Sequence, residues 1–167
     1  MVKKFSIFIL VCLLALLTWM CINVFNFTSK QLDVTEIPTY NINHKKAINN
    51  FSESLTYRTI SIADSWNIDI LPFIHFNEFL KRTYPLTFEN LEERIFSDHS
   101  ILLKWEGNNS VPRNPILLMA HLDVVPALNE ELWIEKPFSG IDKSGFIWGR
   151  GAFDQKSSVI SILEGIE

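Results

Sequence analysis

The sequence is poor in cysteine and has no excess of positive charge, and each shortage excludes a class of function. Both cysteines, Cys12 and Cys21, lie inside one apolar run, so the rest of the chain forms no intrachain disulfide and supplies no cysteine nucleophile. The formal net charge is -4 and the 15 basic residues are scattered, which excludes nucleic acid as the main partner. A Gly-x-Ser-x-Gly motif, typical of serine hydrolases, is also absent from the sequence.

A long apolar run near the N-terminus predicts a membrane helix. Residues 5–24 contain no charged side chain, and as a helix they would cross a hydrocarbon core about 30 Å thick. Lys3 and Lys4 precede the run and the next charge is Lys30, so the positive-inside rule predicts a cytoplasmic N-terminus. The alternatives are a cleaved signal peptide, for which the run ends without an Ala-x-Ala-like site, and a buried helix of a soluble domain. We favour a retained single-pass signal anchor over residues 5–25.

Four regions are therefore predicted along the chain. A cytoplasmic tip over residues 1–4 and the anchor come first, then a polar stalk over residues 26–43, then a folded part over residues 44–167. The folded part would be extracytoplasmic, in a secretory or vacuolar lumen, outside the cell, or in a periplasm. Asn-x-Ser/Thr triplets begin at Asn26, Asn50 and Asn108; they would be glycan acceptors in a eukaryotic secretory protein and carry no meaning in a bacterial one.

The sequence of the folded part predicts both helices and strands. Helices are predicted over residues 44–57 and 70–82. Strands are predicted over residues 100–105 and 115–120, on either side of a Gly-Asn-Asn-Ser turn at residues 107–110. The second strand is almost continuously apolar, which is typical of a strand covered on both faces in an α/β sheet.

A short strand over residues 146–148 and a helix over residues 157–167 are predicted to complete the folded part. Because the sequence stops inside this helix, we expect the domain to be truncated at Glu167.

A histidine and a carboxylate follow the apolar strand directly. His121 and Asp123 are two positions apart, so in extended backbone their side chains point the same way. Asp123 could then accept a hydrogen bond from one ring nitrogen of His121 while the other nitrogen binds a metal. The His-x-Asp pattern alone is a weak signal, since any three-residue pattern recurs by chance.

A second candidate is Asp154, which follows the Gly149-Arg150-Gly151 turn and comes just before a helix. One interpretation is a helix N-cap, a common role for aspartate. The other is a carboxylate that bridges two metal ions about 3.5 to 4 Å apart in a hydrolytic site. The residue alone does not decide between the two.

Taken together, the motifs resemble a known family. The order Ala-His-Leu-Asp-Val-Val-Pro-Ala (120–127), Pro-Phe-Ser-Gly (137–140) and Gly-Arg-Gly-Ala-Phe-Asp-Gln-Lys (149–156) closely resembles the zinc aminoacylase and carboxypeptidase family. The chain looks most like the carboxypeptidase S and N-acyl-amino-acid hydrolase branch, whose members often carry an N-terminal membrane segment. One departure is Ser157, where many members have glycine.

The resemblance implies a fold, a site and a reaction. It implies an α/β catalytic domain with a mostly parallel sheet flanked by helices, and a homodimer in the full-length protein. It makes His121 a ligand of one of two zinc ions, Asp154 the carboxylate that bridges both, and Asp123 the active-site aspartate that orients His121. The peptide bond after Asp154 would often be cis, and the paired glutamates and remaining ligands would lie beyond Glu167.

The implied reaction is hydrolysis of an amide bond in a small peptide or an N-acyl amino acid by metal-activated water. The alternative is a noncatalytic membrane-anchored binding protein, or a pseudoenzyme fragment that lacks a complete metal site.

Overall fold

A computed structural model describes residues 2–31, 42–62, 68–108 and 114–167. The chain divides into two units, Met1–Asn41 and Ile42–Glu167. The stalk prediction falls largely on residues 32–41, and the predicted turn at residues 107–110 falls partly on residues 109–113; both of these segments lie outside the described residues.

In the described residues of the first unit there is one helix, α1 (Val2–Phe25), which confirms the predicted apolar helix. Two of its polar side chains bond to the helix's own backbone: Thr18 Oγ1 donates to Leu14 O at 2.8 Å and Asn23 Nδ2 donates to Trp19 O at 2.8 Å. The segment Lys3–Phe25 is long and apolar enough to cross a membrane, and a signal sequence would share both properties.

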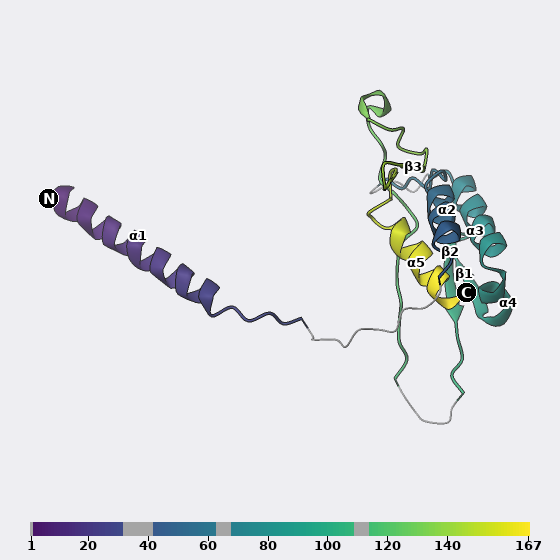
Figure 1. Cartoon of the computed structure of the whole chain (residues 1–167), viewed down its shortest axis with the longest axis horizontal. Coiled ribbons are helices and arrows are strands. Elements are labelled where there is room, and N and C mark those ends of the chain that lie inside the picture. Colours follow the sequence, from purple (N-terminus) through teal and green to yellow (C-terminus); the bar gives the residue numbers. More distant parts are fainter. Residues whose placement is uncertain (1, 32–41, 63–67, 109–113) are drawn as a thin grey trace. The chain divides into compact units, whose positions relative to one another are not determined.

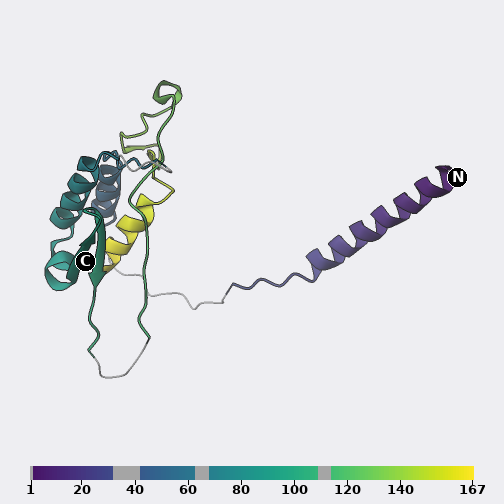
Figure 2. The same ribbon diagram turned by 180° about the vertical axis from the view of Figure 1, so that it is seen from behind.

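The second unit is built around helices that lie side by side in Figures 1 and 2. The helix predicted at residues 44–57 is α2 (His44–Ser54), which begins where Asn43 Oδ1 accepts a hydrogen bond from Lys46 N at 3.0 Å. The helix predicted at residues 70–82 is α3 (Leu71–Thr83). The sequence did not predict α4 (Pro85–Asn90), which starts at a proline, a residue suited to the first helical position. The last helix is α5 (Lys156–Ile166).

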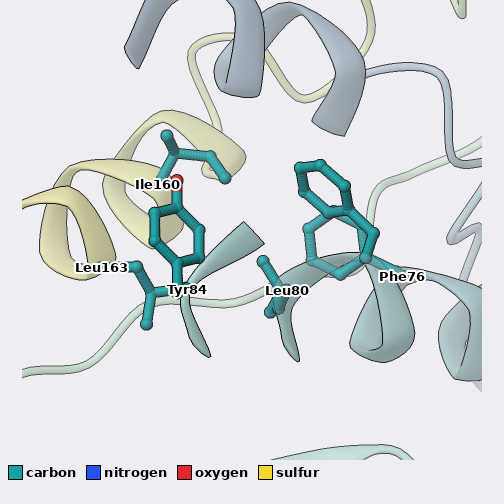
Figure 3. Close-up of a cluster of buried hydrophobic side chains, with 6 residues drawn as sticks. Phe76, Leu80, Tyr84, Ile160 and Leu163 are labelled. Atoms are coloured by element: carbon teal, nitrogen blue, oxygen red, sulfur yellow. The ribbon is translucent and has the colours of Figure 1, made fainter. Parts of the chain in front are cut away.

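The hydrophobic core lies between α3 and α5 (Figure 3). Tyr84 is fully buried in this core, and its hydroxyl donates a hydrogen bond to Glu164 Oε1 at 2.9 Å. The same oxygen accepts a hydrogen bond from Asn50 Nδ2 at 2.6 Å, which ties α2 to α5. The other buried core residues are Phe76, Phe79, Leu80, Ile160 and Leu163.

The strands form two small antiparallel hairpins. In the first, β1 (Glu92–Phe96) pairs with β2 (Ser100–Lys104), and in the second β3 (Ile141–Lys143) pairs with β4 (Phe146–Trp148). The predictions at residues 100–105 and 146–148 are confirmed, whereas β1 and β3 were missed. Between Ile60 and Val124 there is one isolated parallel bridge.

The predicted strand over residues 115–120 is not observed. Its apolar side chains are exposed rather than covered, from 60% at Leu118 to 88% at Ile116. An interior strand needs neighbours that satisfy its backbone groups on both edges, and no described residues pair with this segment. The α/β composition is thus as predicted, but both sheets in the described part of the chain are antiparallel rather than mostly parallel.

Candidate metal centre

His121 lies between two carboxylates. Its Nδ1 atom is 3.2 Å from Asp123 Oδ1 and 3.0 Å from the Asp123 carbonyl oxygen. Its Nε2 atom is 3.0 Å from Asp154 Oδ1, although 33 positions separate the two residues. The structure therefore brings together the three residues that the sequence singled out, with the two aspartates on opposite nitrogens of the ring.

The pair formed by His121 and Asp154 has the spacing of two ligands on one metal ion. Ligand atoms about 2 Å from zinc at a tetrahedral angle are about 3.3 Å apart, close to the 3.0 Å between His121 Nε2 and Asp154 Oδ1. An imidazole nitrogen and a carboxylate oxygen are also donors that zinc accepts. Within the described residues, however, no group of three or more His, Cys, Asp or Glu side chains is arranged to hold a metal ion. This part of the chain therefore brings together two candidate ligands, His121 and Asp154, and a carboxylate, Asp123, next to the other ring nitrogen.

The two carboxylates also control the protonation of His121. Partial burial is the largest single influence and lowers the pKa of the imidazole. The hydrogen bond with the Asp154 side chain, the hydrogen bond with the Asp123 backbone and the charges of both carboxylates together outweigh it and raise the pKa above its ordinary value. A protonated imidazole donates from both nitrogens, so a metal ion at Nε2 would have to displace a proton.

Asp154 stands at the end of the turn that leads into α5. The N-cap residue of this helix is Gln155, which makes no side-chain capping bond, so the N-cap interpretation of Asp154 is wrong. Gln155 Oε1 instead accepts a hydrogen bond from the His121 backbone N–H at 3.3 Å. The peptide bond between Asp154 and Gln155 is cis, as the family resemblance implied.

The Gly-Arg-Gly turn permits a close approach to the His121 segment. Gly151 has a φ of +84°, and a Cβ atom built on it would lie 2.6 Å from Val124 Cγ1. The neighbouring Arg150 holds the same turn to the loops after His121, because its N–H donates to Pro137 O at 2.6 Å and its guanidinium lies 5.0 Å from the centre of the Trp133 ring. A larger residue at position 151 would separate the segments that carry His121 and Asp154.

The sequence did not identify Ser61, which contacts the site from another segment. Thr59, Ile60 and Ser61 lie beside Val124: Val124 N donates to Thr59 O at 2.8 Å and Ser61 N donates to Val124 O at 3.0 Å. Ser61 Oγ donates a hydrogen bond to Asp123 Oδ2. No motif includes Ser61, so only the folded chain reveals this contact.

Lys156, two positions after Asp154, is fully buried. Its ammonium donates to Ser54 O at 3.0 Å and Tyr57 O at 2.6 Å and lies 4.8 Å from the centre of the Phe76 ring. Burial lowers the pKa of Lys156 to about 7. A signal for this position was present in the sequence, since Lys156 shares a helical face with Ile160 and Leu163.

A cavity of about 400 Å³ opens beside His121 and Asp123. Its wall combines polar side chains with apolar ones, so a molecule in the cavity would meet both kinds of surface next to the candidate site. The lining residues include Ser61, Phe73, His99, Ser100 and Ile101.

Comparison with known proteins gives a family match for the part of the chain that carries the candidate site. Residues 117–167, which contain His121, Asp123 and Asp154, match the model of peptidase family M20/M25/M40. This part of the chain is therefore similar to the M20 peptidase family. The relationship agrees with the resemblance seen in the sequence motifs.

Curated relatives extend the match towards the N-terminus. "Probable carboxypeptidase S-like 2" of Dictyostelium discoideum is 35% identical over 93% of this chain, which covers 31% of that protein. "N-fatty-acyl-amino acid synthase/hydrolase PM20D1" of Mus musculus is 40% identical over 55% of this chain, which covers 18% of that protein. "Uncharacterized carboxypeptidase C24C9.08" of Schizosaccharomyces pombe is 35% identical over 64% of this chain. The chain thus spans less than a third of the length of these relatives.

Proposed function

We propose that this chain supplies the N-terminal part of the active site of a zinc-dependent amide hydrolase, whose substrates are small peptides or N-acyl amino acids. The observation that carries the proposal is the 3.0 Å distance between His121 Nε2 and Asp154 Oδ1 inside the part of the chain that matches the M20 family. The substrate classes are those in the printed names of the relatives, which include carboxypeptidases and an N-fatty-acyl-amino acid hydrolase.

In this proposal each of the three residues has one task. His121 Nε2 and Asp154 hold zinc, with Asp154 shared between two ions. Asp123 accepts a hydrogen bond from the Nδ1–H of His121, which leaves the Nε2 lone pair free for the metal and increases the basicity of the ring. The chemistry that such ions supply is acidification of a water molecule and polarisation of the substrate carbonyl.

The remaining parts of the proposal concern the longer protein. Catalytic zinc normally has three protein ligands, so the further ligands and the glutamate base belong to segments outside the described residues. The exposed apolar run at residues 116–119 would be an interior strand of a mostly parallel sheet completed by those segments. We also propose that α1 anchors the protein in a membrane and that the full-length protein is a homodimer.

A zinc titration of the full chain in detergent, measured by calorimetry, tests the metal site. We expect weak binding, because two ligands cannot hold two ions tightly, and we expect Asp154→Ala to abolish it. Asp142→Ala, which removes an exposed carboxylate from β3, is the matched control and should bind as the unmodified chain does. Tight binding of two zinc ions, or unchanged binding in Asp154→Ala, would show that the site is assigned wrongly.

The alternative is a binding protein that keeps the fold without a complete site. Hydrolysis of N-acyl amino acids and dipeptides by a longer protein that includes this chain would decide between the two. Activity that zinc restores after chelation supports the enzyme, and zinc-independent binding of the same compounds without turnover supports the alternative.

A further inference from the structure

We propose that Ser61 is a positioning residue that holds the Asp123 carboxylate against His121, an inference that rests on the proposed metal site. The two carboxylate oxygens of Asp123 have different partners. Oδ2 accepts the hydrogen bond from Ser61 Oγ, and Oδ1 is 3.2 Å from His121 Nδ1. A carboxylate engaged on both oxygens cannot turn without losing one of the contacts, so Ser61 fixes the direction in which Asp123 meets the imidazole ring.

The position of Ser61 is set by backbone contacts. The hydrogen bonds on either side of Val124 align residues 59–61 in parallel with residues 122–124. Thr59 Oγ1 adds a hydrogen bond to Leu122 O at 2.6 Å. Because these bonds do not involve the Ser61 side chain, the hydroxyl can be removed while the alignment of the two segments remains.

The expected consequence concerns the tautomer of His121. In neutral imidazole one nitrogen carries the proton, and the hydrogen bond at each nitrogen decides which one. The Asp123 carbonyl oxygen, 3.0 Å from Nδ1, and the Asp123 carboxylate oxygen, 3.2 Å from it, both favour a proton on Nδ1, and the negative charge of the carboxylate strengthens this preference, whereas Asp154 at 3.0 Å from Nε2 favours the other tautomer. Only the tautomer protonated on Nδ1 presents an Nε2 lone pair to a metal. By holding Asp123 in place, Ser61 shifts the balance towards the form that binds metal.

The experiment measures this tautomer directly in the metal-free full chain. Nitrogen NMR of histidine-labelled protein in detergent reports the ratio of the Nδ1–H to the Nε2–H form at a pH where His121 is neutral, and the chain has only four histidines. We expect Ser61→Ala to lower the ratio about fivefold, which corresponds to about 1 kcal/mol, the usual net strength of one hydrogen bond. Ser61→Thr, which keeps a hydroxyl, should retain the ratio. Ser100→Ala, which alters another serine of the same cavity, should also leave it unchanged.

A double substitution separates positioning from a general effect on the fold. If Ser61 acts through the Asp123 carboxylate, adding Ser61→Ala to Asp123→Ala, which removes that carboxylate, should change the ratio no further. An unchanged ratio in Ser61→Ala, a full extra change in the double variant, or an equal change in Ser100→Ala overturns the inference. The tautomer ratio is measured without metal, and zinc is then added in a separate titration of the unmodified chain. If the ratio responds to Ser61 as expected while zinc leaves the His121 signals unmoved, the proposed function fails and the positioning role stands.

Discussion

Lys156 should make the stability of the folded part rise with pH in the alkaline range. The pKa of this fully buried lysine is lowered by burial from 10.5 in the unfolded chain to about 7 in the folded chain. Between these two values the unfolded chain binds the proton and the folded chain does not, so folding releases a proton and the free energy of unfolding increases with pH. The lysine's contribution is therefore greatest above pH 10.5 and is lost as the pH falls towards 7.

The magnitude follows from the size of the shift. Each pH unit inside this window contributes up to about 1.4 kcal/mol, so raising the pH from about 7 to about 9 should increase the free energy of unfolding by about 2 kcal/mol. Lys156→Met keeps the length and apolar stem of the side chain but has no proton to release. Its unfolding free energy should lack this increase, although the variant also loses the hydrogen bonds to Ser54 O and Tyr57 O.

Urea unfolding of the full chain in detergent, monitored by tryptophan fluorescence at several pH values, measures how the free energy of unfolding changes with pH. The difference between the unmodified chain and Lys156→Met cancels the groups that titrate in both proteins. Lys104→Met is the matched control, because Lys104 is exposed and the adjacent Glu106 raises its pKa. If the curves for the unmodified chain and Lys156→Met run parallel between about pH 7 and 9, Lys156 keeps its proton in the folded state and the reasoning is refuted.

Two further predictions follow from the structure. Gly151→Ala should lower the free energy of unfolding by about 1 to 3 kcal/mol, because position 151 has φ +84° and the added Cβ would lie 2.6 Å from Val124 Cγ1. The control is Gly165→Ala, since Gly165 lies on α5 with open space around it. An equal loss of stability in both variants would contradict the close approach at Gly151. In sealed vesicles, protease added on the cytosolic side should leave the Ile42–Glu167 unit intact, and its digestion there would refute the proposed topology.

Local patterns in the sequence predicted most of the helices. Apolar residues at helical spacing predicted α3 and α5, and the predicted first residue of each helix differs by one from the observed first residue. The uncharged run predicted α1. The prediction of a strand at residues 115–120 was wrong for a physical reason. Apolar composition indicates that a segment suits a covered position, but a strand exists only where neighbouring strands satisfy its backbone, and that depends on residues far away in the chain.

The closeness of His121 and Asp154 could be expected from the family resemblance, but the contacts that produce it could not. Two contacts join the segments directly: Gly151 lies against Val124, and Gln155 bonds to the His121 backbone. A third contact, from Lys156 to Ser54 O, ties the start of α5 to the end of α2. Each contact joins residues that are far apart in sequence, so no periodicity reveals it.

These contacts also explain how the candidate site forms beside a segment that is not a strand. The residues preceding His121 are exposed and unpaired in the described part of the chain, so no sheet fixes the direction of its side chain. The direction of the His121 side chain is instead fixed by residues that follow it and by residues 59–61. The bridge between Ile60 and Val124 aligns the two segments, Ser61 holds Asp123, and Asp123 contacts His121. In this structure the contacts that set the spacing of His121, Asp123 and Asp154 are therefore the backbone hydrogen bonds on either side of Val124 and the close approach at Gly151.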